Sequence, residues 1–391
     1  MGSRGCATLA FQVQGVAVGW QVYALTHSTF QLGMVGLAQF LPMVLLNLVV
    51  GQVADRYNRR NIIAICQLVE CSAATVLALG SYGGWLGVTG IFTAVAVLGA
   101  ARAFEGPTTQ ALAPGLVDKS QLPRAMAVMS SFFQTTAIIG PALGGFLYAL
   151  GPAVSYGSAA MFFLTGCLAT SSIRIPYAVP RREPATLASI FLGIHFIRSR
   201  PAVLGAISLD LFAVLLGGAT ALLPVFAREI LRTGPWGLGL LRASPALGAL
   251  TMSITLAQRP IPGRAGRAMF SAVMMFGAAT VVFALSHWIA LSMFALFVLG
   301  ASDVVSVVIR QSLVQLETPD AMRGRVSAVN SLFIGTSNQL GEFESGVTAA
   351  WWGTVPATVI GGVGSIVVAV LWMGWFPELR KLDKLRAKEE L

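Results

Sequence analysis

Continuous apolar runs of about 20 residues recur along the whole chain and restrict its fold more than any other feature. Since an α-helix rises 1.5 Å per residue, each run is long enough to cross the hydrocarbon core of a bilayer. Only 11% of the 391 residues are charged and 55% are hydrophobic, whereas soluble domains carry about 25% charged residues. A membrane β-barrel would show short alternating segments instead. The sequence therefore predicts an all-α membrane protein.

Polar and turn-forming residues divide the apolar runs into about twelve transmembrane helices. The predicted spans are 5–26, 30–54, 62–82, 85–104, 123–150, 155–174, 202–227, 236–257, 268–286, 288–310, 324–351 and 355–376. The one long break holds Pro176, Pro180 and Pro184 and an amphipathic stretch over 187–197, which predicts a linker with an interfacial helix. We expect a six-helix bundle over 1–174, the linker over 175–201, a second bundle over 202–376 and a tail over 377–391.

An internal repeat relates the two predicted bundles. A shift of 201 residues places Gln110 on Gln311, Leu112 on Leu313, Arg124 on Arg325, Gly140 on Gly341 and Gly145 on Gly346. Apolar composition alone does not explain matches that include arginines in loops. Two parallel six-helix halves with pseudo-symmetry follow, which is an architecture of transporters.

The positions of the basic residues predict the orientation in the membrane. One alternate set of loops holds Arg56, Arg59, Arg60, Lys119, Arg124, Arg174, Arg181, Arg182, Arg198, Arg200, Arg259, Arg264, Arg267, Arg323, Arg325 and the basic tail, and the opposite set holds only Arg228 and Arg232. Because Lys and Arg accumulate in cytoplasmic loops, both termini are predicted to lie in the cytoplasm, with the spans in the cytoplasmic membrane. The net charge of +10 is then a topology signal, and no nucleic acid is expected as a partner.

The second and third spans are joined by a charged motif that contains Gly51, Asp55, Arg56, Arg59 and Arg60. A glycine allows close helix packing, and a carboxylate is stabilised at the positive N-terminus of another helix. We interpret the motif as a gating latch between the two halves on the cytoplasmic side. The alternative is an ordinary positive-inside turn, which requires neither the aspartate nor the glycine.

The fifth span carries Gly140-Pro141-Ala142-Leu143-Gly144-Gly145. The proline kinks a helix and frees a carbonyl, and the glycines permit tight contact with a neighbouring span. The pattern favours a functional kink, although a purely structural kink would have the same sequence. Arg102, near the end of the fourth span, is either a functional cation or an arginine that extends toward the cytoplasmic surface.

Ionisable residues inside the spans are candidates for proton or substrate coupling, because charges are expensive in the bilayer. Asp210 is the leading candidate, since it lies close to mid-bilayer in the seventh span; weaker candidates are Glu70, Asp303, Glu342 and Glu344. Asp303 and Arg310 share one helix face, where structural pairing is an equal alternative. Gln14 either lines a central cavity or bonds across helices.

The chain has no Gly-x-x-x-x-Gly-Lys-Ser/Thr loop for a nucleotide. Its four cysteines and three histidines lack the spacing of metal ligands or of a catalytic nucleophile with its base. We therefore expect neither an enzyme nor a cofactor, and transport energy must come from an ion gradient or from the gradient of the substrate.

Together, the segments 51–60, 140–145 and 322–331 resemble motifs of the major facilitator superfamily, in the branch of drug–proton antiporters and enterobactin exporters. The first segment matches Gly-x-x-x-Asp-Arg-x-x-Arg-Arg, and the second is similar to the Gly-Pro-x-x-Gly-Gly signature of antiporters. The resemblance implies the major facilitator fold and a proton-coupled exporter of a siderophore or another amphiphilic small molecule, working by alternating access as a monomer. Open alternatives are a multidrug efflux pump, a solute importer or lipid transporter, and a non-transporting sensor.

Overall fold

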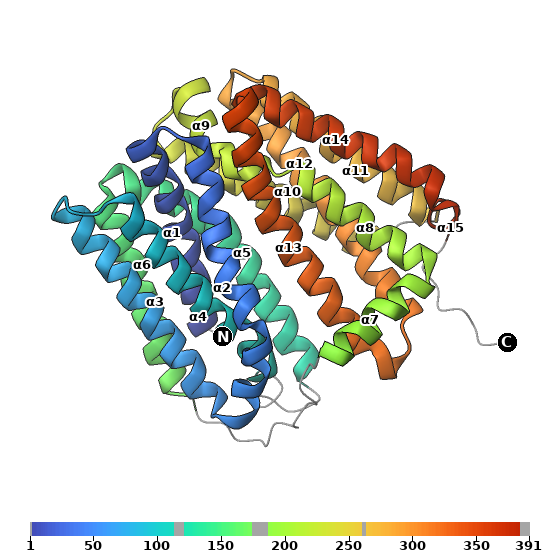
Figure 1. Ribbon diagram of the computed structural model, residues 1–391, viewed down its shortest axis with the longest axis horizontal. Helices are drawn as coiled ribbons and strands as arrows, with labels where there is room; N and C mark the ends of the chain where they lie inside the picture. The colour runs from blue at the N-terminus through green and yellow to red at the C-terminus, as the bar shows by residue number, and fades with distance from the viewer. Residues whose placement is uncertain (1, 113–120, 174–186, 260–262, 384–391) are drawn as a thin grey trace. The chain divides into compact units, whose positions relative to one another are not determined.

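A computed structural model of the chain describes residues 2–112, 121–173, 187–259 and 263–383. Every long element in these ranges is an α-helix (Figure 1). The helices that precede the linker are α1 (Gly2–Thr26), α2 (Thr29–Arg56), α3 (Arg59–Tyr82), α4 (Val88–Leu112), α5 (Leu122–Ala149) and α6 (Pro152–Ser171). Those that follow are α7 (Leu187–Ser199), α8 (Pro201–Leu216), η2 (Ala219–Leu222), α9 (Leu223–Val225), η3 (Phe226–Ile230), α10 (Pro235–Gln258), α11 (Ala265–Leu285), α12 (Ile289–Glu317), α13 (Asp320–Trp352), α14 (Thr354–Trp375) and α15 (Pro377–Arg380).

Helices form over all the predicted spans, and most boundaries agree within three residues. Within the described ranges, nine helical stretches are long and apolar enough to cross a membrane. The other three long helices, α1, α5 and α13, have 25, 28 and 33 residues. The amphipathic helix of the linker forms as α7, whereas the rest of the linker before 187 and the end of the tail lie outside the described residues.

Three predicted spans differ from the helices that form. The span over 288–310 ends seven residues too early, because α12 continues to Glu317. The span over 202–227 is interrupted, because α8 ends at Leu216 and Gly217 and Gly218 separate it from the 3₁₀ turn η2. The span over 85–104 is too short, because α4 continues through Pro107 to Leu112. A proline inside a membrane helix is tolerated where neighbouring groups satisfy the freed carbonyl.

Contacts divide the chain into two compact units, each of which packs around its own interior. The first unit comprises Met1–Pro184 and Ala227–Ala243, and the second comprises Ala185–Phe226 and Ser244–Leu391. The segment Ala227–Ala243, which holds most of η3 and the start of α10, therefore packs with α1–α6 rather than with α8. The predicted domain ranges stay a prediction.

In the first unit α1 packs against α5 and α6, α3 packs against α4 and α6, and α2 packs against α4. Small buried residues such as Ala7, Ala10 and Ala159 line the contact of α1 with α6 around Phe163. Small side chains let helix backbones approach closely, which is how helices associate in lipid, where no hydrophobic driving force exists between them.

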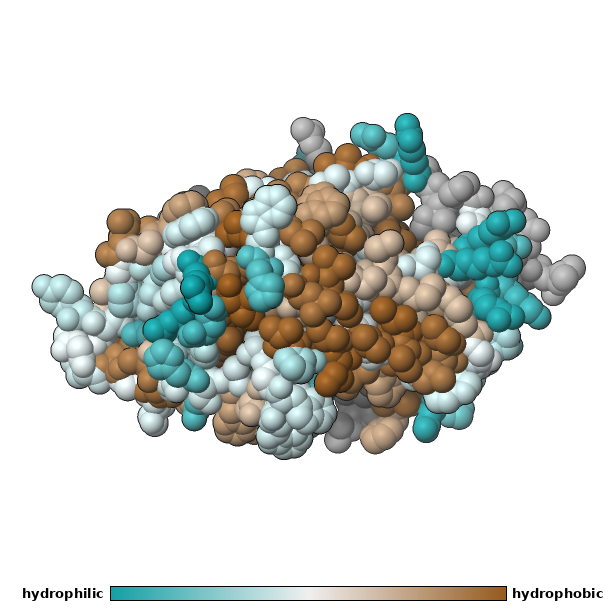
Figure 2. All heavy atoms as spheres, turned by 90° about the horizontal axis from the view of Figure 1, so that it is seen from above, coloured by the Kyte–Doolittle hydropathy of each residue, from teal (hydrophilic) through white to brown (hydrophobic). Residues whose placement is uncertain are grey.

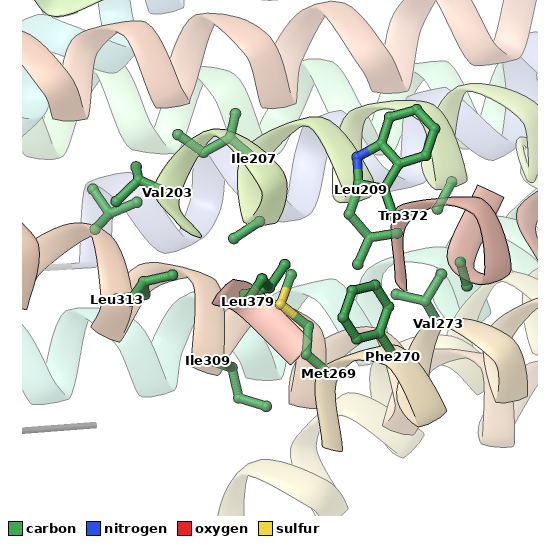
Figure 3. Packing of buried hydrophobic residues seen from close by; sticks show 14 of the residues in the cluster. Val203, Ile207, Leu209, Met269, Phe270, Val273, Ile309, Leu313, Trp372 and Leu379 are labelled. Carbon is green, nitrogen blue, oxygen red and sulfur yellow. The ribbon is translucent and has the colours of Figure 1, made fainter. Parts of the chain in front are cut away.

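In the second unit α8, α11, α12 and α14 surround a core that contains Leu209, Met269, Phe270, Ile309 and Trp372 (Figure 3). The indole nitrogen of Trp372 donates a hydrogen bond of 2.9 Å to the Ser208 hydroxyl, which ties α14 to α8.

The repeat recurs in the packing of the two units. Gly99 of α4 lies against the main chain of α2 at Gln39, and Gly300 of α12 lies against the main chain of α10 at Pro245. The two glycines are separated by 300 − 99 = 201 residues, the shift found in the sequence.

Large apolar side chains also cover the outside of the helices, as expected for a protein surrounded by lipid. Leu45, Leu79 and Met161 are 67%, 60% and 70% exposed. Figure 2 shows hydrophobic side chains in brown over much of the visible face, with hydrophilic side chains gathered in separate teal patches.

Candidate functional site

The second unit holds a buried ion pair between Asp210 of α8 and Arg310 of α12. Asp210 follows Leu209 in the core of this unit, and Arg310 is one of its largest fully buried side chains. An Arg310 Nη2 to Asp210 Oδ2 distance of 3.2 Å joins side chains that are only 2% and 8% exposed. Arg310 Nη1 also donates a hydrogen bond of 2.8 Å to Asn330 Oδ1 on α13. Three helices thereby hold one guanidinium inside the membrane-spanning part of the protein.

Asp303 lies on the same face of α12 as Arg310, two turns earlier, and close enough for electrostatic interaction with both Arg310 and Asp210. Ser306 lies between them at helical spacing, and its buried hydroxyl has no hydrogen-bond partner in the described part of the chain. The cluster of Asp210, Asp303 and Arg310 thus brings two carboxyl groups to one guanidinium.

Asp303 also lines a cavity of about 290 Å³ in the second unit. Gly217 and Gly218, where α8 breaks, line the same cavity, together with Thr220 and Asn338. This volume corresponds to about ten water molecules at the volume per molecule of liquid water. A carboxyl group that meets a cavity while its neighbours are fully packed is the member of the cluster best placed to exchange a proton with water.

Glu342 and Glu344 occupy one stretch of α13 and are half-buried. The main-chain carbonyl of Glu344 accepts a hydrogen bond of 2.9 Å from the Thr348 hydroxyl. Neither glutamate lines the cavity beside Asp303.

In the first unit a polar network joins α1, α3, α4 and α6. Gln67 Nε2 donates hydrogen bonds to Glu105 Oε1 at 2.9 Å and to the Ser3 hydroxyl at 3.2 Å. The Thr170 hydroxyl donates to Gln67 Oε1 at 2.9 Å and lies 2.5 Å from the Ser3 hydroxyl. The four side chains are at most 8% exposed, so the network is internal to the bundle.

The arginine of the fourth span, Arg102, lies over the ring of Phe11 on α1, with 3.7 Å from the guanidinium carbon to the ring centre. Such a contact stabilises a cation where water is scarce.

One turn along α1, Gln14 is 2% exposed, and neither its amide oxygen nor its amide nitrogen has a hydrogen-bond partner among the described residues. The next residue is Gly15, and Arg242 Nη1 of α10 lies 3.4 Å from the position that a β-carbon would occupy there.

The glycines of the fifth span are contact points for two helices of the first unit. A β-carbon at Gly140 would lie 2.5 Å from the Gln12 side chain, and one at Gly144 would lie 2.9 Å from the main chain of Val13, so α5 crosses α1 closely. A β-carbon at Gly145 would lie 2.5 Å from the Pro235 carbonyl oxygen and 2.9 Å from Gly239 Cα on α10. Pro141 lies inside α5 between these contacts.

Comparison with known proteins gives the family. The family model described as "Transmembrane secretion effector" matches residues 5–390, nearly the whole chain. The chain belongs to this family.

Exporters are among the relatives of this chain. The chain is 27% identical to the enterobactin exporter EntS of Citrobacter koseri, over 97% of this chain and 91% of the relative. It is 26% identical to the enterobactin exporter EntS of Escherichia coli O81 with the same coverage.

Solved structures share the fold at low identity. A bacterial homologue of the human lysosomal transporter Spinster, in an inward-facing conformation, has a TM-score of 0.73 and 12% identity, with 97% of this chain and 94% of that chain covered. A POT family transporter in complex with 5-aminolevulinic acid has a TM-score of 0.76 and 11% identity, with 97% and 95% covered. The secretion effector therefore has the major facilitator fold and is a multi-pass secondary transporter of small molecules, not an enzyme.

The charged motif of the secretion effector lies at the end of α2 and the start of α3. Gly51 and Asp55 lie near the C-terminal end of α2, and the Asp55 side chain lies outside the described residues. Arg56 is exposed, Arg59 begins α3, and Arg60 Nη1 donates a hydrogen bond of 3.1 Å to the Ile173 carbonyl. The latch stays a prediction.

The structure adds a residue that the sequence analysis of the secretion effector missed. Glu105 fell beyond the predicted end of the fourth span at residue 104, whereas α4 continues to Leu112. The signal available in the sequence was its spacing: Glu105 follows Arg102 by three residues and therefore shares its helix face.

Proposed function

We propose that this secretion effector is a proton-coupled exporter of a siderophore or another amphiphilic small molecule. It works by alternating access in the bacterial cytoplasmic membrane, as a monomer with both termini in the cytoplasm. The observation that carries the proposal is the buried cluster in which Arg310 faces Asp210 and Asp303. Because buried charges are costly in the bilayer, a cluster of this kind marks an ion or proton pathway.

Proton coupling follows from the charge of this cluster. Two ionised carboxylates and one guanidinium would leave one uncompensated negative charge in a low-dielectric interior, which is strongly unfavourable. Asp210 is paired directly with Arg310, so Asp303 at the cavity is the group that takes up and releases the proton. Asn330 and Asp210 are positioning residues that keep Arg310 in place.

The substrate class is supported by the relatives and by the charges of the chain. Both curated relatives named above are enterobactin exporters, and the similarity extends over almost the full length of each. Catecholate siderophores are anionic, and Arg102, Arg242 and Arg310 are cations within the spans. An anionic amphiphile fits such a set of guanidinium groups.

The direction of transport is supported by the glycine and proline pattern of α5. The Gly-Pro-x-x-Gly-Gly stretch resembles an antiporter signature, and Gly145 in it contacts α10 at Gly239 with no room for a side chain. The latch formed by Gly51, Asp55 and the following arginines would open and close the cytoplasmic side in each cycle.

Transport into inside-out membrane vesicles tests the proposal. Enterobactin should accumulate in vesicles with an acidic lumen and not in vesicles without a pH gradient, and Asp303→Asn should remove the effect of the gradient. The matched control is Glu378→Gln, which neutralises an exposed carboxylate. Accumulation of the cation ethidium in place of enterobactin would identify a multidrug pump. Uptake into right-side-out vesicles driven by an inward proton gradient would identify an importer and overturn the proposal.

A further inference from the structure

Glu70, in the middle of α3, is a carboxyl group that the coupling cluster of the second unit does not use. Its side chain is 0% exposed, and neither carboxyl oxygen has a hydrogen-bond partner among the described residues. Moving a bare carboxylate into such an environment is strongly unfavourable, because the charge loses its hydration and gains no hydrogen bond. Glu70 therefore holds a proton in this state of the protein.

The charges around Glu70 come from α4. Glu105 and Arg102 are the two side chains that interact with it most strongly through charge. Glu105 accepts a hydrogen bond from Gln67 Nε2, and Arg102 supplies one positive charge. One proton on Glu70 makes the sum of these three side chains zero, and its loss leaves a net charge of −1.

Charged and titratable side chains also lie on α3 itself and on the helices that pack against α3 and α4. They are Arg4, Cys6 and Tyr23 of α1, Asp55 and Arg56 of α2, Arg59, Arg60, Cys66, Cys71 and Tyr82 of α3, and Tyr156 and Cys167 of α6. Of these, the Cys66 thiol also interacts through charge with Glu70 and Glu105, whereas the charges that act on Glu70 itself are those of Glu105 and Arg102.

We propose that Glu70 binds an exchangeable proton and that Glu70, Glu105 and Arg102 form a proton site within the first unit. The step is the loss of one proton from the Glu70 carboxylic acid, which leaves a carboxylate close to the Arg102 guanidinium. Because the deprotonated cluster carries an uncompensated charge, loss of the proton requires water to reach the site. The packing of the bundle must therefore change when Glu70 releases its proton. Gln67 is a positioning residue that orients Glu105 by its hydrogen bond.

The internal repeat supports this assignment. The shift of 201 residues places Arg102 on Asp303 and Glu105 on Ser306. Helices α4 and α12 thus occupy equivalent places in the repeat, and each contributes to a cluster of two carboxyl groups and one guanidinium. The inference rests on the proposed proton coupling and adds a second proton site to it.

Infrared spectroscopy of the purified full chain in lipid nanodiscs tests the site without any substrate. Glu70 and Asp303 should each contribute a C=O stretching band of a protonated carboxylic acid. Glu70→Gln should remove the Glu70 component and leave that of Asp303, and Glu378→Gln should leave both. Glu105→Gln should also weaken the Glu70 component, because Glu70 then becomes the counter-ion of Arg102 and ionises. An unchanged band in Glu70→Gln overturns the inference, and so does a band that Glu105→Gln leaves intact.

Exchange of the proton is tested by transport. Glu70→Gln should lose the stimulation of enterobactin export by a pH gradient. Full stimulation in this variant, together with loss of the Glu70 infrared component, would make Glu70 a structural carboxylic acid and would overturn the inference. If a pH gradient does not stimulate export by the wild-type protein, the proposed function is contradicted instead, whatever the infrared band shows.

Discussion

Removing the guanidinium of Arg310 should destabilise the second unit more than removing either of its carboxylate partners. In Arg310→Met the side chain keeps most of its length, while Asp210 and Asp303 are left without a cation in the protein interior. In Asp210→Asn, by contrast, Asp303 remains as a counter-ion for Arg310. The two single variants should therefore lose different amounts of stability, although they remove opposite partners of one ion pair.

The size of the effect follows from the geometry of the pair. Two unit charges 3.2 Å apart attract each other by about 5 kcal/mol at an effective dielectric constant of about 20. Breaking a buried pair by removing one partner typically costs about 3–5 kcal/mol, whereas replacing both partners is often neutral. We expect a loss in this range for Arg310→Met, a smaller loss for Asp210→Asn, and a double variant that is more stable than Arg310→Met.

The assay is reversible unfolding of the purified protein in mixed detergent micelles, followed by tryptophan fluorescence for wild type, both single variants and the double variant. The double-mutant cycle yields the interaction energy of Asp210 with Arg310. A double variant whose loss equals the sum of the two single losses would refute the reasoning, because the two charges would then not depend on each other.

Three further substitutions test the packing and the latch. Gly145→Ala should lower the free energy of unfolding by about 1–3 kcal/mol in the same assay, because the new methyl group meets the Pro235 carbonyl. The control Gly157→Ala should not destabilise the protein, because nothing lies within 4 Å of its new methyl group. Equal stabilities of the two variants would contradict the packing of α5. Trp372→Phe should cost at least about 1 kcal/mol, because it removes the bond to the Ser208 hydroxyl and leaves empty space in the core, and an unchanged midpoint would argue against this packing. Asp55→Asn should insert normally but transport poorly, and wild-type transport rates would disprove the latch.

Most of the fold follows from the sequence because the bilayer leaves few choices. Every backbone group in lipid must be bonded within the segment, so long apolar runs become helices with predictable ends. Caps sharpen these ends: Ser28 precedes α2 and accepts a bond from the Gln31 amide, and Asn58 does the same for Arg60 at the start of α3. The linker helix α7 was predicted for a similar reason, from its amphipathic pattern.

The break after α8 could not be predicted from hydropathy, since Gly217 and Gly218 lie within a continuous apolar run. Two adjacent glycines weaken a helix, but only tertiary packing decides whether the helix breaks there. A β-carbon at Gly218 would lie 2.6 Å from the Gly341 carbonyl oxygen, so close contact with α13 selects glycine at this place.

The candidate site was predicted in part. Asp210, Asp303 and Arg102 were recognised because charges are rare in membrane spans, and the structure brings the first two together at Arg310. Which charges meet depends on the rotation and register of each helix, and a hydropathy pattern contains neither. The Gln67 network and the electrostatic interaction of Glu70 with Glu105 were missed for this reason.

The direction of proton movement during substrate release tests the central claim most directly. Proteoliposomes that contain the purified protein, enterobactin and a pH-sensitive dye would be diluted into medium without substrate. An antiporter takes up protons as substrate leaves, whichever way it is inserted, so the account predicts that the lumen becomes more acidic as enterobactin appears outside. A lumen that becomes more alkaline, or one whose pH is unchanged while enterobactin is released, would contradict it.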